Sequence, residues 1–202
     1  MAKRVGLTGG IATGKSAVAG FFRARGIPVV DADQVARDVV QPGEPALAEI
    51  VKTFGGEVLE GEALDRKKLG ALVFADESAR KKLNAIIHPR IAMESQRQLN
   101  EASKLVAPYV LYEAALLVEN KIHTAFAALV VVSVPDATQL ERLMKRDSSD
   151  VASARARIAS QMPLAEKEAL ADYLITNDGT LEETEEQVQK VHEALIAQFT
   201  DV

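Results

Sequence analysis

Eight residues near the N-terminus, Gly9 to Ser16, follow the order G-x-x-x-x-G-K-S. Glycines let the backbone turn several N–H groups inward, which makes a cradle for anions. Lys15 would reach the β- and γ-phosphates of a nucleoside triphosphate, and Ser16 would join a Mg²⁺ shell. The pattern therefore predicts a phosphate-binding loop. The residues expected to line the triphosphate are Gly10, Ile11, Ala12, Thr13, Gly14, Lys15, Ser16 and Ala17.

Such a loop requires a strand before it and a helix after it. The apolar run Val5–Thr8 supplies the strand, and Lys15–Arg25 has helical spacing with a stop at Gly26. The N-terminal end of that helix would add its positive dipole to the phosphate site. Ile27–Val30 predicts a second strand, so the loop lies in a βαβ unit.

The rest of the chain alternates between strand and helix patterns. Three more strands are predicted, two of them followed by helices, over Tyr109–Glu113, Ala128–Val134, Asp136–Lys145, Tyr173–Thr176 and Thr180–Gln198. Thr180 and Glu183 form a capping-box pattern at the start of the last helix. The alternation predicts an α/β fold with a five-stranded parallel sheet, whose ligands gather at the carboxyl ends of the strands.

Two segments depart from this alternation. Residues 34–104 have a mixed helical pattern with breaks at Gln41-Pro42-Gly43, at Phe54-Gly55-Gly56 and at His88-Pro89. They read as a helical insertion between the second and third strands. Residues 147–162 are polar, basic and poor in apolar anchors, which is typical of a lid that closes over a nucleotide.

Carboxylates follow two of the predicted strands. Asp33, after the second strand, would accept the proton of a hydroxyl that attacks the γ-phosphate. Alternatively, Asp31 or Asp33 caps the following helix. Glu113, after the third strand, would hold Mg²⁺ or serve as an ordinary loop carboxylate. Glu119 stands in apolar surroundings, which favours a structural ion pair.

Basic residues gather late in an acidic chain, at Arg142, Arg146, Arg155 and Arg157. Guanidinium groups match phosphate oxygens and stabilise charge during phosphoryl transfer. The alternative is a solvated basic helix. Of the three histidines, His88 precedes a proline and is expected at a helix start or turn, where a structural role is the simpler interpretation.

Bulk properties limit the class of protein. The 202 residues carry a net charge of −5 and no cysteine, which excludes disulfides, thiolate metal sites and a cysteine nucleophile. The acidic balance argues against nucleic-acid and anionic-membrane partners. No apolar run approaches the ~20 residues of a membrane span. A strand pattern starts almost at Met1, which leaves no room for a signal peptide, so a cytoplasmic protein is expected.

The motifs together resemble those of the dephospho-coenzyme A kinase family, and the resemblance runs almost end to end. It rests on the phosphate loop and on an ordered series of short motifs: Asp31-Ala32-Asp33, Pro42-Gly43, Phe54-Gly55, Leu64-Asp65-Arg66, Leu83-Asn84 with His88-Pro89, Leu116-Leu117-Val118-Glu119, Gln139, Arg142, Arg146, Arg157-Ile158 with Gln161, and Ala171-Asp172 with Asn177.

The resemblance implies that ATP donates its γ-phosphoryl group to the ribose 3′-hydroxyl of dephospho-CoA, the last step of coenzyme A synthesis. It implies a P-loop kinase fold of three layers, in which residues 1–33, 105–145 and 163–202 form the nucleotide-binding core, 34–104 the CoA-binding insertion and 146–162 the lid. ATP and dephospho-CoA are the expected partners, with Mg²⁺ as cofactor, in a monomer or small homo-oligomer.

The resemblance also distributes roles among single residues. Asp33 becomes the general base, and Lys15 and Arg146 stabilise the transferring phosphoryl group. The remaining implied contacts are Arg142 and Asn177 to ATP, Asp33, Arg66, His88 and Leu116 to dephospho-CoA, and Ser16 and Glu113 to Mg²⁺.

The chain departs from the family pattern at a few positions. Alanine stands at 12, 17 and 115, where the family commonly has a glycine, a threonine and a proline. Thr13 stands where the family commonly has a serine, and Glu113 where aspartate is frequent. Two other functions stay open: a different P-loop kinase acting on a nucleoside monophosphate or sugar acid, and a GTP-driven switch. The chain lacks the Asn-Lys-x-Asp motif with which GTPases recognise guanine.

Overall fold

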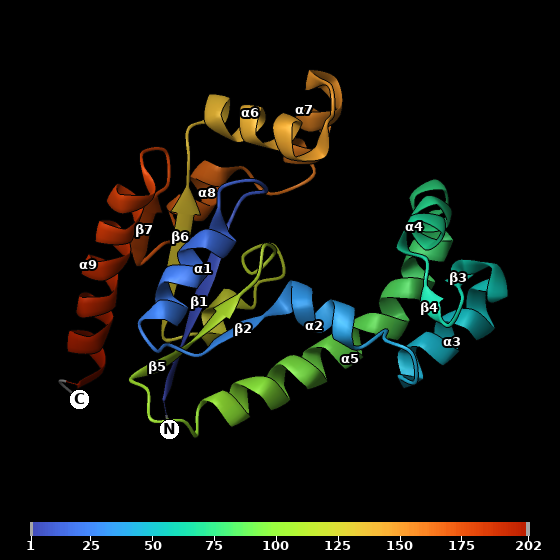
Figure 1. Cartoon of the computed structure of the whole chain (residues 1–202), viewed down its shortest axis with the longest axis horizontal. Helices are drawn as coiled ribbons and strands as arrows, with labels where there is room; N and C mark the ends of the chain where they lie inside the picture. The colour runs from blue at the N-terminus through green and yellow to red at the C-terminus, as the bar shows by residue number, and fades with distance from the viewer. Residues whose placement is uncertain (1, 201–202) are drawn as a thin grey trace. The chain divides into compact units, whose positions relative to one another are not determined.

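A computed structural model describes residues 2–200 (Figure 1). The chain divides into two compact units. The first contains the N-terminal residues up to Val30 and the chain from Leu99 onward, and the second is Asp31–Gln98. Each unit is taken by itself below.

The first unit is built on a five-stranded sheet in the order β2-β5-β1-β6-β7 (Figure 1). The strands are β1 (Lys3–Gly9), β2 (Val29–Asp31), β5 (Tyr109–Glu113), β6 (Ala128–Ser133) and β7 (Tyr173–Thr176). β1 pairs in parallel with β5 and β6, and β6 with β7. β5 and β6 are buried along their whole length, which explains their unbroken apolar sequences. The predicted parallel sheet is confirmed.

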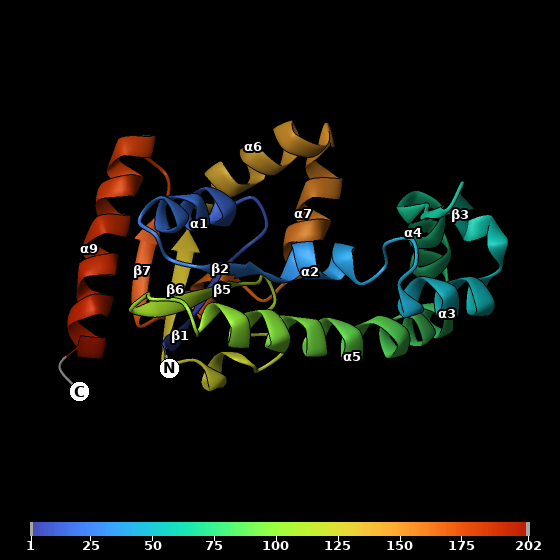
Figure 2. The same ribbon diagram turned by 60° about the horizontal axis from the view of Figure 1, so that its bottom comes forward.

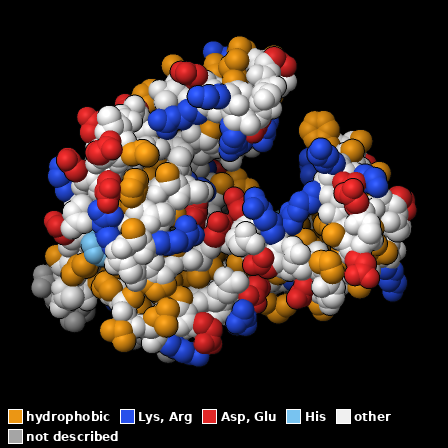
Figure 3. Space-filling model, in the orientation of Figure 1, with side chains coloured by type: hydrophobic (Ala, Val, Ile, Leu, Met, Phe, Trp, Pro, Cys, Tyr) orange, Lys and Arg blue, Asp and Glu red, His pale blue; other side chains and the backbone are white. Residues whose placement is uncertain are grey.

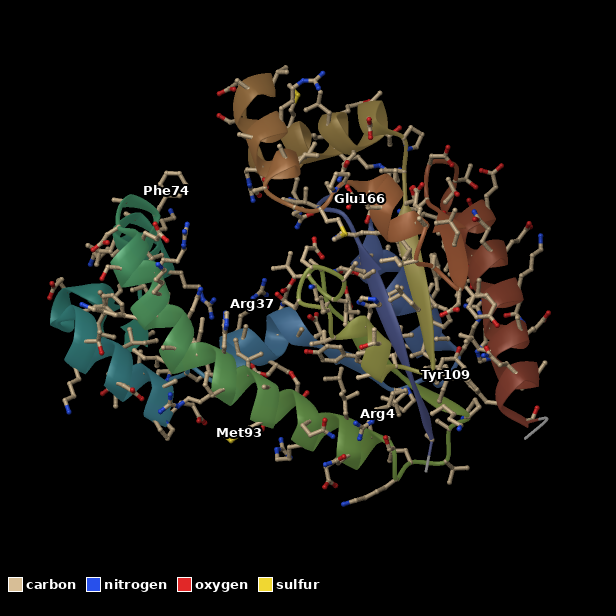
Figure 4. All side chains as sticks on the ribbon, turned by 180° about the vertical axis from the view of Figure 1, so that it is seen from behind. Arg4, Arg37, Phe74, Met93, Tyr109 and Glu166 are labelled. Atoms are coloured by element: carbon tan, nitrogen blue, oxygen red, sulfur yellow. The ribbon has the colours of Figure 1, made fainter. Side chains whose placement is uncertain are left out.

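Two helices, α1 (Lys15–Ala24) and α9 (Leu181–Thr200), pack on the same side of this sheet. Figure 2 shows α9 running alongside β7. Phe22 from α1 and Leu195 from α9 join Leu7, Leu111 and Val130 in a fully buried core. Thr180 and Glu183 exchange the two hydrogen bonds of the predicted capping box. Tyr109 of β5 is labelled in Figure 4. Its hydroxyl lies 2.7 Å from Nδ1 of His192 in α9.

The first unit also contains a short 3₁₀ turn at His123–Ala125 and the helices α6 (Asp136–Asp147), α7 (Val151–Ala159) and α8 (Leu164–Glu168). No helix bounds were predicted within 147–162, although a basic helix was the alternative interpretation of its arginines, and α7 forms there. Asp150 caps α7 by accepting a hydrogen bond from the backbone N–H of Ser153, and Ala154 is its buried anchor.

The second unit is mainly helical, as predicted for this part of the chain. It contains α2 (Ala32–Asp38), α3 (Pro45–Phe54), a 3₁₀ turn at Gly56–Val58, α4 (Arg66–Ala75) and most of α5 (Glu77–Ala102). A hairpin of two short strands, β3 (Leu59–Glu60) and β4 (Ala63–Leu64), was not predicted. Two residues per strand are too few to produce an alternating apolar pattern.

The predicted break at His88-Pro89 is wrong. Pro89 lies inside α5, which continues for 26 residues, and His88 is an exposed residue in mid-helix rather than at a start or turn. A proline removes one helical hydrogen bond and crowds the preceding turn. The Arg90 guanidinium donates to the carbonyl of Ile86 in that turn at 2.6 Å. Buried residues on both sides of the proline, Ile86 and Leu99, hold the helix against its neighbours.

The surface combines dispersed charges with single apolar side chains (Figure 3). Phe74 on α4 is 93% exposed and extends away from its helix (Figure 4). Lys and Arg side chains gather over the region of α6 and α7 (Figure 3). Among residues 2–200, no helix combines the length and the apolar character needed to cross a bilayer.

Candidate active site

The glycine-rich loop joins the carboxyl end of β1 to the first turn of α1, as predicted. Two of its residues have left-handed backbone angles, Ala12 with φ 61° and Gly14 with φ 84°. Gly10 O accepts hydrogen bonds from the Thr13 backbone N–H at 3.4 Å and from Thr13 Oγ1 at 3.0 Å. The loop is therefore a closed turn that ends at the positive pole of a helix, which is an anion site.

Close contacts leave little room for a side chain at three loop glycines. A Cβ on Gly14 would lie 2.0 Å from Nδ2 of Asn177, and one on Gly10 would lie 2.5 Å from Nε2 of Gln139. A Cβ on Gly9 would lie 2.5 Å from the backbone oxygen of Val132 in β6. The loop thus fits against side chains from distant parts of the sequence.

Those side chains brace the loop backbone. Gln139 in α6 donates to Ile11 O at 2.8 Å, and Gln161 beyond α7 accepts from Ile11 N at 2.8 Å. Asn177, which follows β7, donates to Thr13 O at 2.8 Å and accepts from Thr184 Oγ1. Both glutamines belong to the motifs of the family resemblance, but no role was predicted for them. Partners 128 and 150 residues apart leave no local signal.

Glu113 brings together the loop lysine and serine. Its side chain is 1% exposed at the end of β5. Oε1 accepts a hydrogen bond from Ser16 Oγ at 2.8 Å and pairs with Lys15 Nζ at 3.1 Å. Oε2 lies 3.7 Å from the Arg23 guanidinium. A buried carboxylate requires such partners, so Glu113 is not an ordinary loop carboxylate.

The side chains of Glu113 and Ser16 together fit a magnesium ion. Glu113 Oε2 is buried without a hydrogen-bond partner in the described structure, although Arg23 is near. Ser16 presents its hydroxyl on the adjacent turn of α1. Hard oxygen donors of this kind suit Mg²⁺, which usually takes one or two protein ligands and completes its shell with phosphates and water. Within residues 2–200 there is no cluster of three His, Asp or Glu side chains that would hold a metal unaided.

The arginines of α6 have different surroundings. Arg142 Nη1 donates to the backbone oxygen of Asn177 at 2.7 Å, so it contacts a residue that is itself bonded to the glycine-rich loop. Arg146 is half exposed and pairs through Nε with Asp147 at 2.9 Å, and Arg157 also pairs with Asp147. Hydrogen bonding to Asp147 raises the pKa of Arg146 above its ordinary value. Arg146 therefore stays cationic, with Asp147 as its present partner.

Asp31, rather than Asp33, caps the helix after β2. Asp31 Oδ1 accepts from the backbone N–H groups of Asp33 at 2.8 Å and Gln34 at 3.2 Å. Asp33 is exposed in the first turn of α2. Because Asp31 supplies the cap, the Asp33 carboxylate is not needed to cap α2.

The remaining predicted acceptor residues are exposed. Arg66 is the first residue of α4, and His88 lies on α5, both in the second unit. Leu116 is 44% exposed in the turn after β5 of the first unit. The ion pair predicted for Glu119 is present, with Lys167 Nζ at 2.7 Å.

A parallel sheet with a braced glycine loop, a lysine and serine at a buried carboxylate, and arginines beside them defines the class of P-loop kinases. The dephospho-CoA kinase family model matches residues 3–183. A dephospho-CoA kinase of Shouchella clausii is 50% identical over 186 residues, which cover 92% of this chain and 94% of the relative.

Solved structures agree with this match. A crystal structure from Thermus thermophilus has a TM-score of 0.80 at 33% identity and covers 96% of this chain and 97% of its own. The dephospho-CoA kinase from Campylobacter jejuni has a TM-score of 0.75 at 26% identity, covering 98% and 99%. The chain belongs to the dephospho-CoA kinase family.

Proposed function

We propose that this protein transfers the γ-phosphoryl group of ATP to the ribose 3′-hydroxyl of dephospho-CoA, the final step of coenzyme A biosynthesis. The observation that carries the proposal is family membership over residues 3–183 in a chain whose phosphate loop is built for a triphosphate. ATP is the phosphoryl donor in this proposal.

The donor side follows from the loop. The backbone N–H groups of residues 12–16 surround the phosphates, and the Lys15 ammonium leaves Glu113 to meet the β- and γ-phosphates. Arg142, beside Asn177, contacts the nucleotide from α6. Arg146 exchanges Asp147 for the γ-phosphoryl oxygens, where its cationic charge stabilises the transition state.

Asp33 acts on the acceptor. Its carboxylate takes the proton of the ribose 3′-hydroxyl while that oxygen forms its bond to the γ-phosphorus. The bond from the γ-phosphorus to the β,γ-bridging oxygen breaks, and ADP leaves with the bonding electrons. Arg66, His88 and Leu116 hold dephospho-CoA in this proposal.

Mg²⁺, held by Ser16 and Glu113, would neutralise the charge of the β- and γ-phosphates when bound. The same proposal assigns residues 34–104 to CoA binding and residues 146–162 to a lid. The lid assignment is supported by the basic side chains there and by a cavity of about 1330 Å³ lined by α6, α7 and the segment before α8.

A coupled assay with ATP, Mg²⁺ and a panel of acceptors tests the function. We expect ADP release with dephospho-CoA, a product carrying a 3′-phosphate, and little turnover with adenosine monophosphate or sugar acids. Turnover of adenosine monophosphate without turnover of dephospho-CoA would identify a different P-loop kinase. Tight nucleotide binding without transfer to any acceptor would identify a nucleotide sensor.

A further inference from the structure

A fully buried lysine lies outside the machinery proposed so far. Lys167 on α8, the short helix that Glu166 marks in Figure 4, is 0% exposed. Its Nζ pairs with Glu119 Oε1 at 2.7 Å and donates to Ala115 O at 2.8 Å. Withdrawing an ammonium from water costs several kcal/mol, and a buried pair regains little net stability over apolar residues of the same size. Stability alone therefore gives a weak reason for Lys167.

Both partners of Lys167 lie in the turn after β5, and each of them also contacts a different segment of the chain. Glu119 Oε1 also accepts a hydrogen bond from the Met162 backbone N–H at 3.3 Å, at the end of the basic segment. Ala115 O also accepts from Thr8 Oγ1 at 3.2 Å, one residue before the glycine loop begins. One ammonium thus connects the end of β1, the turn after β5 and the base of the predicted lid.

These connections reach residues that we assign to the donor site. Ala115 stands two residues after Glu113, whose carboxylate holds Lys15 and Ser16. Met162 follows Gln161, whose side chain accepts from the Ile11 backbone N–H in the phosphate loop. A shift at either anchor would be transmitted to Glu113 or to Ile11 through one or two residues of backbone.

We propose that Lys167 is a positioning residue for phosphoryl transfer, which through Glu119 and Ala115 fixes the turn after Glu113 and the base of the 146–162 segment. The inference rests on the proposed function. Supporting residues of this kind keep reacting groups in productive geometry without touching the substrate.

The test separates positioning from stability by removing both charges together. In the variant Lys167→Met/Glu119→Leu, apolar side chains of similar size replace the pair, so the fold is expected to survive. The Ala115 carbonyl loses its ammonium donor and keeps only the Thr8 hydroxyl, and the Met162 N–H loses its carboxylate acceptor. We expect kcat to fall by about 10–100-fold, the size of effect that follows loss of the outer-shell partners of metal ligands. The thermal midpoint and the KM for dephospho-CoA should stay close to those of the wild type.

Two further variants keep the test decisive. Lys167→Met/Glu119→Gln retains an acceptor for the Met162 N–H, and its kcat should lie between those of the wild type and the first variant. Thr8→Val removes the second donor to Ala115 O with a change of few atoms and should lower kcat by a smaller factor. Wild-type kcat in the folded Lys167→Met/Glu119→Leu protein overturns the inference. If that protein does not fold, wild-type kcat in Lys167→Met/Glu119→Gln overturns it, because that variant also removes the ammonium.

A matched control uses an ion pair of the same unit that is remote from the loops. Arg25, the C-cap residue of α1, pairs with Glu185 of α9 at 3.1 Å. Arg25→Met/Glu185→Leu should leave kcat unchanged. The wild type is assayed in parallel: no turnover there would overturn the proposed function, whereas wild-type turnover with undiminished variants overturns the role of Lys167 alone.

Discussion

The residues that we propose for ATP and those that we propose for dephospho-CoA are held in different ways. In the first unit, Lys15 and Ser16 meet a carboxylate that is 1% exposed, and the loop backbone is bonded to Gln139, Gln161 and Asn177. In the second unit, the candidate residues Asp33, Arg66 and His88 are exposed on helices. The phosphate site is prepared before a ligand arrives, whereas the acceptor residues are presented without a comparable brace.

This difference predicts different responses to substitution. A change in the braced loop should cost both folding free energy and turnover, because each loop atom has several partners. A change on an exposed helix should leave stability intact and alter the kinetics alone. Four variants test that division, beginning with the largest expected effect.

Asp33→Asn should lower kcat by roughly 10²–10⁴-fold, the usual size of a general-base effect, while ATP binding stays nearly intact. The thermal midpoint should not change, because Asp31 caps α2. Single-turnover kinetics and nucleotide titration measure the two quantities. Asp38→Asn on the same helix is the matched control and should retain activity. Full kcat in Asp33→Asn would remove Asp33 as the base.

Gly14→Ala should destabilise the first unit by about 3 kcal/mol or more, since it combines a left-handed φ with overpacking against Asn177. Urea unfolding would measure the loss, and nucleotide binding should weaken with it. The matched control is Gly20→Ala in α1, where a Cβ meets no atom within 4 Å. That change should stabilise by about 0.5–1 kcal/mol. A Gly14→Ala protein as stable as the wild type would show that Asn177 and the loop backbone can move enough to accommodate the added methyl group.

Arg66→Ala should raise the KM for dephospho-CoA about tenfold, the size of one lost charge-assisted hydrogen bond, with little change in kcat or the thermal midpoint. Steady-state kinetics at saturating ATP separate the two constants. Lys67→Ala removes the same charge one residue along the helix and should have a smaller effect. Equal effects of both variants would mean that overall charge, rather than Arg66, attracts the substrate.

Acid should affect the second unit slightly through Glu94 on α5. Hydrogen bonds from Arg97 and Gln98 lower the pKa of Glu94 from 4.5 to about 2. Because the folded pKa is depressed, this stabilisation is present above pH 4.5 and is lost as pH falls toward 2. The pair is near the surface, so its contribution is about 0.2–1 kcal/mol. Urea unfolding at pH 7 and pH 3 should show a smaller pH difference for Glu94→Gln than for the wild type.

The sheet could be predicted because its strands are local features. Tyr109–Glu113 has the bounds that its apolar run predicts, since a buried parallel strand leaves continuous apolar sequence. The edge strand Tyr173–Thr176 also has its predicted bounds, although only Ile175 in it is buried. The continuation of α5 through Pro89 could not be predicted. A proline indicates a helix break from the adjacent sequence alone, whereas buried residues at other positions of the helix, Ile86 and Leu99, keep it in place.

The same distinction applies to the site. The glycine loop and its lysine and serine could be predicted because all of them lie within eight residues. The contacts that hold them, such as Glu113 to Lys15 and Gln161 to Ile11, span 98 and 150 residues. Glu113 was found because a strand end is recognisable from sequence, whereas the two glutamines belong to helical or loop segments without such a mark.

The bond between Lys15 and Glu113 gives the donor site the character of an ion exchanger. A vacant loop with a bare lysine would attract any small anion in the cell. Here the Lys15 ammonium already pairs with the Glu113 carboxylate, so an incoming anion must bind strongly enough to offset the loss of that ion pair. A triphosphate can do so with several oxygens at once, and a singly charged ion cannot. The Glu113 carboxylate thus makes binding at the loop depend on the charge and the number of oxygens of the anion.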